Sequence, residues 1–178
     1  MFTVEKTVEV LRALEGDYDG DEAVDQLAHA LQTAELARAA GADDDVVAAA
    51  LLHDIGRAPG VVEHYRGQPH EIAGADFCLR HVGERASYLV GQHVPAKRYL
   101  VVIDEAYAAS LSPASQRSLI RQGGPMSAEE VTAFESHPWA AEAARLRRWD
   151  DAAKVPGARV HELAFYADVL RRVWLPAA

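Results

Sequence analysis

The stretch AALLHDIGRAP, residues 49–59, carries an apolar run directly into a histidine and an aspartate. Three aspartates at 43–45 precede it and suit the first turn of a helix, because carboxylates accept hydrogen bonds from its free amides. We expect this helix to cover residues 46–55, with Gly56 as its end and Pro59 preventing its continuation. His53 and Asp54 then stand at the buried end of a core helix, where polar side chains need partners.

The segments on both sides of this stretch are rich in alanine and show helical spacing, with no polar and apolar alternation over strand length. Pro95 suits a first helical position, and Ser127 with Glu130 fits a capping box. Helices are predicted over residues 1–16, 22–40, 46–55, 70–81, 95–111, 112–124, 127–137, 138–153 and 159–173. The fold class is therefore all-α, a helical bundle that forms a single domain over residues 1–178.

The amino-acid composition limits the classes of partner that the chain is expected to bind. A formal net charge of −9 argues against a nucleic-acid partner, because phosphate backbones are bound by clustered lysine and arginine. The longest apolar run, VVAAALL, is too short to cross a bilayer, so no membrane partner is expected. The single cysteine, Cys78, excludes an internal disulfide, and we predict a cytoplasmic protein.

Metal-ligand residue types recur on separate predicted helices, as they do when a bundle builds a metal site in its core. They are His29, His53, Asp54, His70, His93 and one of the pair Asp150 and Asp151. Four imidazoles and two carboxylates suit iron, manganese or zinc. Six ligands exceed what one catalytic metal takes, so we expect two metals, about 3.5–4 Å apart and bridged by Asp54. A His-Asp pair alone is also an ordinary structural feature.

This order of ligands resembles the HD-domain superfamily in its two-metal arrangement. The strings EAVDQLAHALQTAELA, AALLHDIGR, HEIAGADF, HVPAKRYL, QGGPMSAEEVTAFE and LRRWDDAAK narrow the resemblance. Together they are similar to the mixed-valent di-iron oxygenases that cleave 1-hydroxyphosphonates, which are distant relatives of myo-inositol oxygenase. The resemblance covers most of residues 18–155, and HVPAKRYL with QGGPMS is its most diagnostic part.

The resemblance implies a cofactor and a reaction. Two iron ions, Fe(II) and Fe(III), would use dioxygen to cleave the carbon–phosphorus bond and release phosphate and a carboxylic acid. By this likeness one iron takes His29, His53 and Asp150, the other takes His70 and His93, and Asp54 bridges them. The resemblance also implies catalytic roles for His53, Asp54 and Lys97.

The same resemblance implies contacts to a small anionic substrate. Lys97, Ser115 and Arg147 match positions that hold the phosphonate, and Glu22 matches a carboxylate that faces a substrate amine. The family's lid tyrosine is replaced here by Asp19; Tyr18 is one residue away, and a loop that absorbs this shift would make Tyr18 the substrate contact. Arg57 is an added cation that could bind a second anionic group. We expect a monomer or a homodimer.

Two other readings use the same ligands. The first is a metal-dependent HD phosphohydrolase, in which metal-bound water attacks a small phosphate ester or nucleotide. The second is a structural or sensory metal site that binds a phosphonate without turning it over. Oxygen consumption during turnover separates the oxygenase from both.

Overall fold

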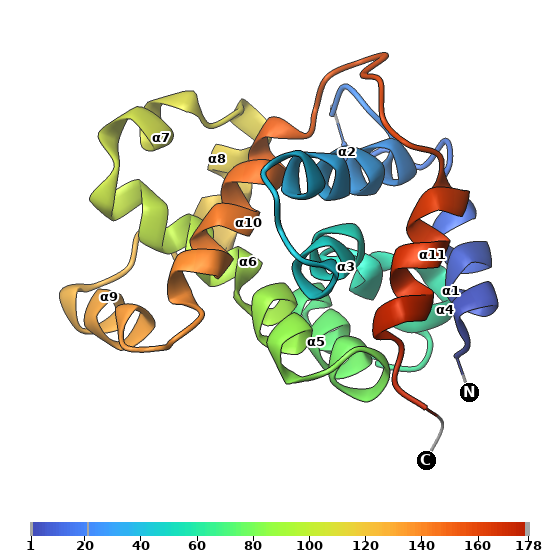
Figure 1. The fold of residues 1–178 in the computed structure, drawn as a ribbon. Coiled ribbons are helices and arrows are strands. Elements are labelled where there is room, and N and C mark those ends of the chain that lie inside the picture. Colours follow the sequence, from blue (N-terminus) through green and yellow to red (C-terminus); the bar gives the residue numbers. More distant parts are fainter. Residues whose placement is uncertain (1, 21, 177–178) are drawn as a thin grey trace.

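The computed structural model describes residues 2–20 and 22–176, and every regular element within them is a helix (Figure 1). The elements are α1 (Val4–Arg12), α2 (Gln26–Ala39), α3 (Asp44–Leu52), the 3-10 helix η1 (Ile55–Arg57), α4 (Pro59–Val62), α5 (His70–His81), α6 (Glu84–Ile103), α7 (Glu105–Ser110), α8 (Pro113–Arg121), α9 (Ala128–Glu135), α10 (Ala140–Ala152) and α11 (Leu163–Val173). The predicted all-α class is confirmed. None of these helices combines the length and the apolarity that a membrane span requires.

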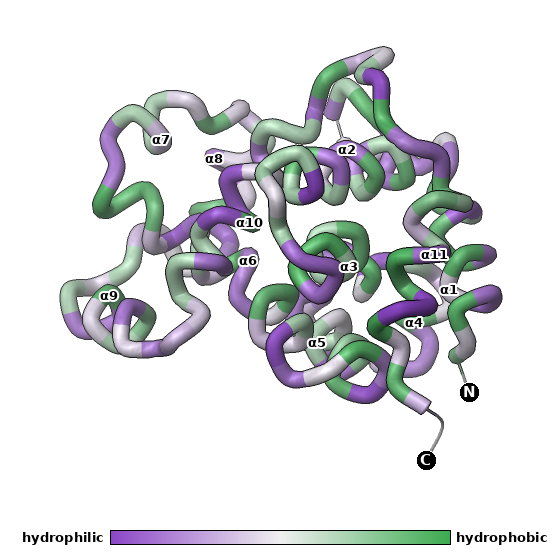
Figure 2. The backbone as a smooth tube through the Cα atoms, in the orientation of Figure 1, coloured by the Kyte–Doolittle hydropathy of each residue, from purple (hydrophilic) through white to green (hydrophobic). Residues whose placement is uncertain are grey.

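Helix α3 forms the centre of the core, as its sequence predicts. All its residues from Val46 to Leu52 are buried, and α2, α5, α6, α10 and α11 each contact it. Figure 1 shows these helices around α3, and Figure 2 shows α3 as mainly hydrophobic while the outer helices alternate in hydropathy. The side chain of Asp43 accepts a hydrogen bond from the amide of Val46 and so caps the helix.

The end of α3 differs from the prediction. The helix ends at Leu52, His53 is its C-cap, and η1 follows after Asp54. Gly56 does not stop the helix through a left-handed conformation, since its φ is not positive. A Cβ at Gly56 would instead lie 2.0 Å from the carbonyl oxygen of His70. Gly56 therefore permits close contact between η1 and the first turn of α5, which brings His70 toward Asp54.

The predicted helix over residues 95–111 is wrong. Pro95 lies inside α6, which begins eleven residues earlier at Glu84 and ends at Ile103. Asp104 then caps a separate short helix, α7, by accepting from the amide of Tyr107. A proline lacks only one amide donor, and the buried residues on both sides of it hold the helix together.

Other predicted boundaries agree with the structure or differ slightly. Helix α5 covers residues 70–81 as expected, and the capping box of Ser127 and Glu130 is present. Helix α2 begins at Gln26 and not at residue 22, because the side chain of Asp25 accepts from the amide of Ala28. The segment that carries Glu22 is therefore a loop that leads into α2.

Candidate metal centre

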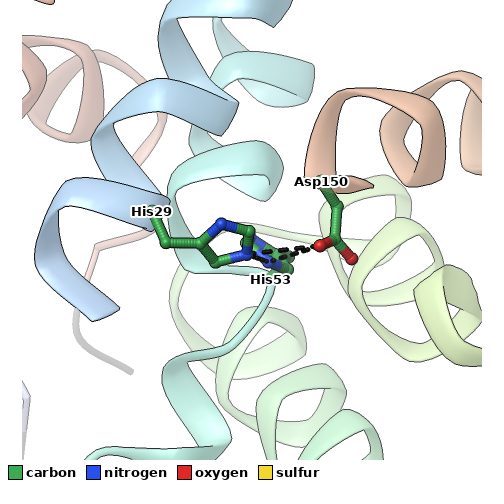
Figure 3. A group of neighbouring side chains, drawn as sticks. All are labelled: His29, His53 and Asp150. Carbon is green, nitrogen blue, oxygen red and sulfur yellow. Dashed lines mark hydrogen bonds and ion pairs between the residues drawn. The ribbon is translucent and has the colours of Figure 1, made fainter. Parts of the chain in front are cut away.

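Three of the six expected ligands meet in a buried cluster, hereafter cluster A, formed by His29, His53 and Asp150. They come from α2, the end of α3 and α10, and their side chains point toward one another (Figure 3). The Nε2 atoms of His29 and His53 are 3.1 Å apart, and Asp150 Oδ1 lies 3.2 Å from His29 Nε2 and 3.8 Å from His53 Nε2. These atoms could hold one metal ion.

The other three expected ligands form cluster B, which consists of Asp54, His70 and His93. The Nε2 atoms of His70 and His93 are 3.2 Å apart, and Asp54 Oδ1 lies 3.2 Å and 3.6 Å from them. The second oxygen of Asp54, Oδ2, lies 3.7 Å from Nε2 of His53 in cluster A. Asp54 thus turns one oxygen toward each cluster, which is the arrangement that a bridging carboxylate needs.

The backbone orients the histidine rings. The Nδ1–H groups of His29, His53 and His93 donate to the carbonyl oxygens of Ala153, Ala50 and Val90 at 2.9, 2.8 and 2.6 Å. Nδ1 of His70 faces the carboxylate of Glu71 at 3.1 Å. A carbonyl only accepts, so each of the first three rings carries its proton on Nδ1 and leaves Nε2 for a cation.

The position of the ring protons, on Nδ1, indicates whether a metal ion fits the site. In neutral rings with protonated Nδ1, the facing Nε2 atoms in each cluster are both acceptors, so neither can donate to the other. A cation between them satisfies both lone pairs and the nearby carboxylate oxygen. The donor set of each cluster, imidazole nitrogen with carboxylate oxygen, suits iron, manganese or zinc.

The electrostatics keep His53 and both central carboxylates in the forms that bind metals, whereas the nearby carboxylates raise the pKa of His29 despite its burial. Burial lowers the pKa of His53 to about 4, so its ring is neutral near pH 7. Burial opposes ionisation of Asp150, but the Arg147 guanidinium together with the facing histidines outweighs it and holds the pKa of that carboxyl well below its usual value. Burial likewise opposes ionisation of Asp54, and Arg57 together with the neighbouring histidines holds the pKa of that carboxyl well below its usual value. Both carboxylates are therefore ionised.

Residues of both clusters line a cavity of about 420 Å³, and helical spacing brings further side chains to the same wall. His93 and Lys97 are four residues apart on α6, so they share one face. Arg147, Asp150 and Lys154 have spacings of three and four along α10 and just beyond its end. All five side chains line the cavity.

The cavity wall contains most of the predicted substrate contacts. Lys97 is 2% exposed and donates to the Ser118 hydroxyl at 2.7 Å, and burial lowers its pKa to about 8. Ser115 lies beside it in the lining, together with Glu22 and Arg57. Among the described residues, the Lys97 ammonium group makes its hydrogen bond to a hydroxyl, so its positive charge is available to an anionic ligand.

Two predicted contacts have a different environment from the one expected. Tyr18 is 55% exposed and does not line the cavity, whereas its neighbour Asp19 lies in the wall. The ring of Tyr18 is therefore not part of the cavity wall in this structure, and the substrate contact expected of Tyr18 stays a prediction. Arg57 binds Asp54 at 2.9 Å and Asp19 at 3.3 Å, so its charge already has internal partners.

Arg147 also binds residues of the chain itself. Its Nη1 contacts Asp150 Oδ2 at 2.6 Å, and its other guanidinium nitrogens donate to Asp151. Asp151 in turn accepts from the hydroxyl of Tyr107 and does not belong to either cluster. The structure thus places Asp150 in cluster A and uses Asp151 to fix Arg147.

Sequence reasoning missed Lys154. Its ammonium group lies 2.6 Å from Glu22 Oε1 and 3.4 Å from Ser115 Oγ. The signal was present, because Lys154 follows Arg147 by seven residues and Asp150 by four, on the same helical stripe. Spacing along the chain does not indicate that Glu22, 132 residues away, pairs with Lys154.

Comparison with known proteins agrees with the geometry. Residues 27–119 match the HD domain. The chain belongs to the HD-domain family. It is 43% identical over 152 residues to hydroxymethylphosphonate dioxygenase of Gimesia maris, a match that spans 82% of this chain and 76% of that protein. The family predicted from the motifs is confirmed.

Two further relatives of this HD-domain chain are 34% identical to it. One is the glycine-betaine-forming [1-hydroxy-2-(trimethylamino)ethyl]phosphonate dioxygenase of Leisingera caerulea, matched over 157 residues, 85% of this chain and 80% of the relative. The other is an uncharacterized protein of Acanthamoeba polyphaga mimivirus, matched over 161 residues, 86% of this chain and 73% of the relative. Both relatives that are named as enzymes are phosphonate dioxygenases.

Proposed function

We propose that this HD-domain protein is an oxygenase that uses dioxygen to cleave the carbon–phosphorus bond of a small 1-hydroxyphosphonate, releasing phosphate and a carboxylic acid. The observation that carries the proposal is the 43% identity to hydroxymethylphosphonate dioxygenase over 82% of the chain. The paired clusters and the basic cavity support it, because the reaction needs a metal centre beside an anion-binding wall.

The proposed reaction balances with the phosphonate and dioxygen as its only reactants. The carbinol carbon loses its bond to phosphorus and becomes a carboxylate, while phosphorus becomes phosphate and one proton is released. Both atoms of one dioxygen molecule enter the products. The reduction of dioxygen balances the oxidation of the carbinol carbon, so no external reductant is consumed.

The proposed cofactor is a pair of iron ions in a mixed Fe(II)/Fe(III) state, which supplies the redox chemistry with dioxygen. Cluster A would hold one ion through His29, His53 and Asp150. Cluster B would hold the other through His70 and His93, with Asp54 shared between them. The single aspartate between two histidine clusters is the feature that favours two ions over one.

The remaining residues of the cavity would bind the substrate or orient a metal ligand. Lys97 supplies a positive charge to the phosphonate at neutral pH, and Ser115 supplies a hydroxyl nearby. Arg147 is a positioning residue, because it holds the Asp150 carboxylate by its outer oxygen, Oδ2, and leaves Oδ1 facing the histidines. We further propose that residues 1–178 form a single HD-type domain, a cytoplasmic monomer or homodimer.

A panel assay tests the proposed function. The protein is purified without air, loaded with iron and given 1-hydroxyphosphonates in the presence of oxygen, while phosphate is followed by phosphorus NMR and oxygen by an electrode. We expect one dioxygen consumed for each phosphate released. The isomer 2-hydroxyethylphosphonate is the control and should not react, because its hydroxyl is on the wrong carbon. Phosphate release from an ester without oxygen consumption would favour the phosphohydrolase instead.

A further inference from the structure

An internal ion pair closes part of the cavity wall. Nζ of Lys154 lies 2.6 Å from Oε1 of Glu22, and the two side chains are 21% and 17% exposed. Both residues line the cavity. A charge-assisted hydrogen bond is among the stronger polar contacts in proteins. The Glu22 carboxylate is therefore already neutralised by a cation of the same chain.

The position of Lys154 is fixed by its backbone. The side-chain amide of Gln32 on α2 bonds both the N–H and the C=O of Val155, at 3.0 and 3.1 Å. On the other side of Lys154, the carbonyl of Ala153 accepts from Nδ1 of His29. The two residues that flank this lysine are thus held against α2, so its ammonium group has a defined position.

The other acidic side chains described in the cavity wall are paired as well. Asp19 and Asp54 bind Arg57, and Asp150 binds Arg147. Within the part of the chain that the structure describes, a ligand ammonium group therefore meets no unpaired carboxylate in this cavity. A cationic substituent would have to displace Lys154 from Glu22. This exchanges one cation for another at the carboxylate and leaves the Lys154 ammonium group without its partner, so binding gains little.

We propose that Lys154 determines substrate specificity by occupying Glu22, and that the substituent on the carbinol carbon of the phosphonate substrate is uncharged. This inference rests on the proposed function and narrows its substrate class. The net neutral Lys154–Glu22 pair offers no gain to a positive or a negative substituent. The phosphonate would be bound in the adjoining part of the same cavity, beside Lys97 and Ser115, and the Ser115 hydroxyl oxygen lies 3.4 Å from Nζ of Lys154.

Two phosphonates that differ by one ammonium group test the proposal. These are (1-hydroxyethyl)phosphonate and (2-amino-1-hydroxyethyl)phosphonate, compared by kcat/KM for phosphate release with the iron-loaded protein. The wild type should prefer the uncharged compound. Lys154→Met should shift the ratio toward the ammonium compound by about tenfold or more, mainly through KM, because Glu22 becomes a free partner for the charge.

Three variants separate charge pairing from a general disturbance. Lys154→Arg keeps a cation beside Glu22 and should retain the wild-type preference. The double variant Lys154→Met with Glu22→Gln should lose the shift, since no carboxylate remains to bind the ammonium group. Lys6→Met makes the same chemical change on the exposed face of α1 and should leave the ratio unchanged.

Binding without oxygen gives a second readout that does not need turnover. Calorimetric titration of the metal-loaded protein under nitrogen should show the same order of preference and the same shift in Lys154→Met. An unchanged ratio in Lys154→Met, or a wild type that prefers the ammonium compound, would overturn the inference. If the wild type releases no phosphate from any phosphonate, the proposed function fails, and the binding order still decides the role of Lys154. Absence of binding by both compounds would overturn both.

Discussion

Replacing Gly56 by alanine tests how the fold brings cluster B together. The added Cβ would lie 2.0 Å from the carbonyl oxygen of His70, 2.8 Å from its carbonyl carbon and 2.9 Å from the amide nitrogen of Gly74. Contacts of a Cβ under 3.0 Å are essentially never observed, so the closest pair must separate by at least about 1 Å. All three atoms belong to the backbone of α5, so no side chain can rotate away, and η1 and α5 must move apart.

The expected cost follows from this clash. Overpacking of a tight core contact typically costs about 1–3 kcal/mol, and a backbone contact lies at the upper end, so we expect the free energy of unfolding to fall by about 3 kcal/mol. A shift of this size also separates His70 from Asp54, so iron binding at cluster B should weaken by at least about tenfold. Urea unfolding and iron content measure the two effects.

Gly60 provides the matched control for this substitution. It lies in α4, and a Cβ there would meet only a side-chain carbon of Val10 at 3.5 Å, an ordinary contact. Gly60→Ala should be neutral or stabilise by about 0.5–1 kcal/mol, since alanine is the better helix former. If Gly56→Ala proved as stable as Gly60→Ala and bound the same iron, the close approach of η1 and α5 would be refuted.

Three further substitutions address single side chains. His53→Ala should abolish iron binding in cluster A and all turnover, as measured by metal analysis; full iron content in the variant would remove His53 from the ligands. Burial lowers the pKa of Lys97 to about 8, so the KM for the phosphonate should rise as the pH increases through about 8 and the ammonium group loses its proton. Lys97→Arg should remove this pH dependence, because arginine stays charged. Identical pH profiles of KM for the two proteins would contradict the assignment of Lys97 to the phosphonate. Arg147→Met should lower the free energy of unfolding by about 3–5 kcal/mol, because it leaves Asp150 buried without its cation. Arg148→Met, at an exposed arginine, is the control and should lower the free energy of unfolding by less than about 1 kcal/mol. Equal losses in urea unfolding would show that the buried ion pair does not stabilise the site.

Helix positions and metal-ligand types could be predicted from the sequence because they follow from local rules. Capping residues such as Asp43 and Ser127 and the apolar content of α3 act within a few positions of the chain. The boundary of α6 could not be predicted, because its proline is tolerated only where tertiary packing supports the helix on both sides. Gly56 likewise looked like a helix stop, and only its contact with α5 shows that it permits a close approach.

The candidate site divides in the same way. Histidines and aspartates on separate helices indicated a metal centre, and the structure brings six of them into two clusters. The pairing of charges could not be predicted, since the partners of Glu22 and Arg57 lie on other segments or depend on the path of a loop. Tyr18 and Asp19 differ by one position in that loop, and spacing alone does not decide which of them faces the cavity.

Counting metals tests the central claim most directly, because that claim is a paired centre with a shared aspartate. The protein and its Asp54→Asn variant are purified without air, reconstituted with iron, desalted and analysed for iron per chain. We predict two ions in the wild type and, in the variant, the loss of at least one ion and of oxygen-dependent phosphate release. One ion or none in the reconstituted wild type, or two ions retained by a variant that is fully active, would contradict the account.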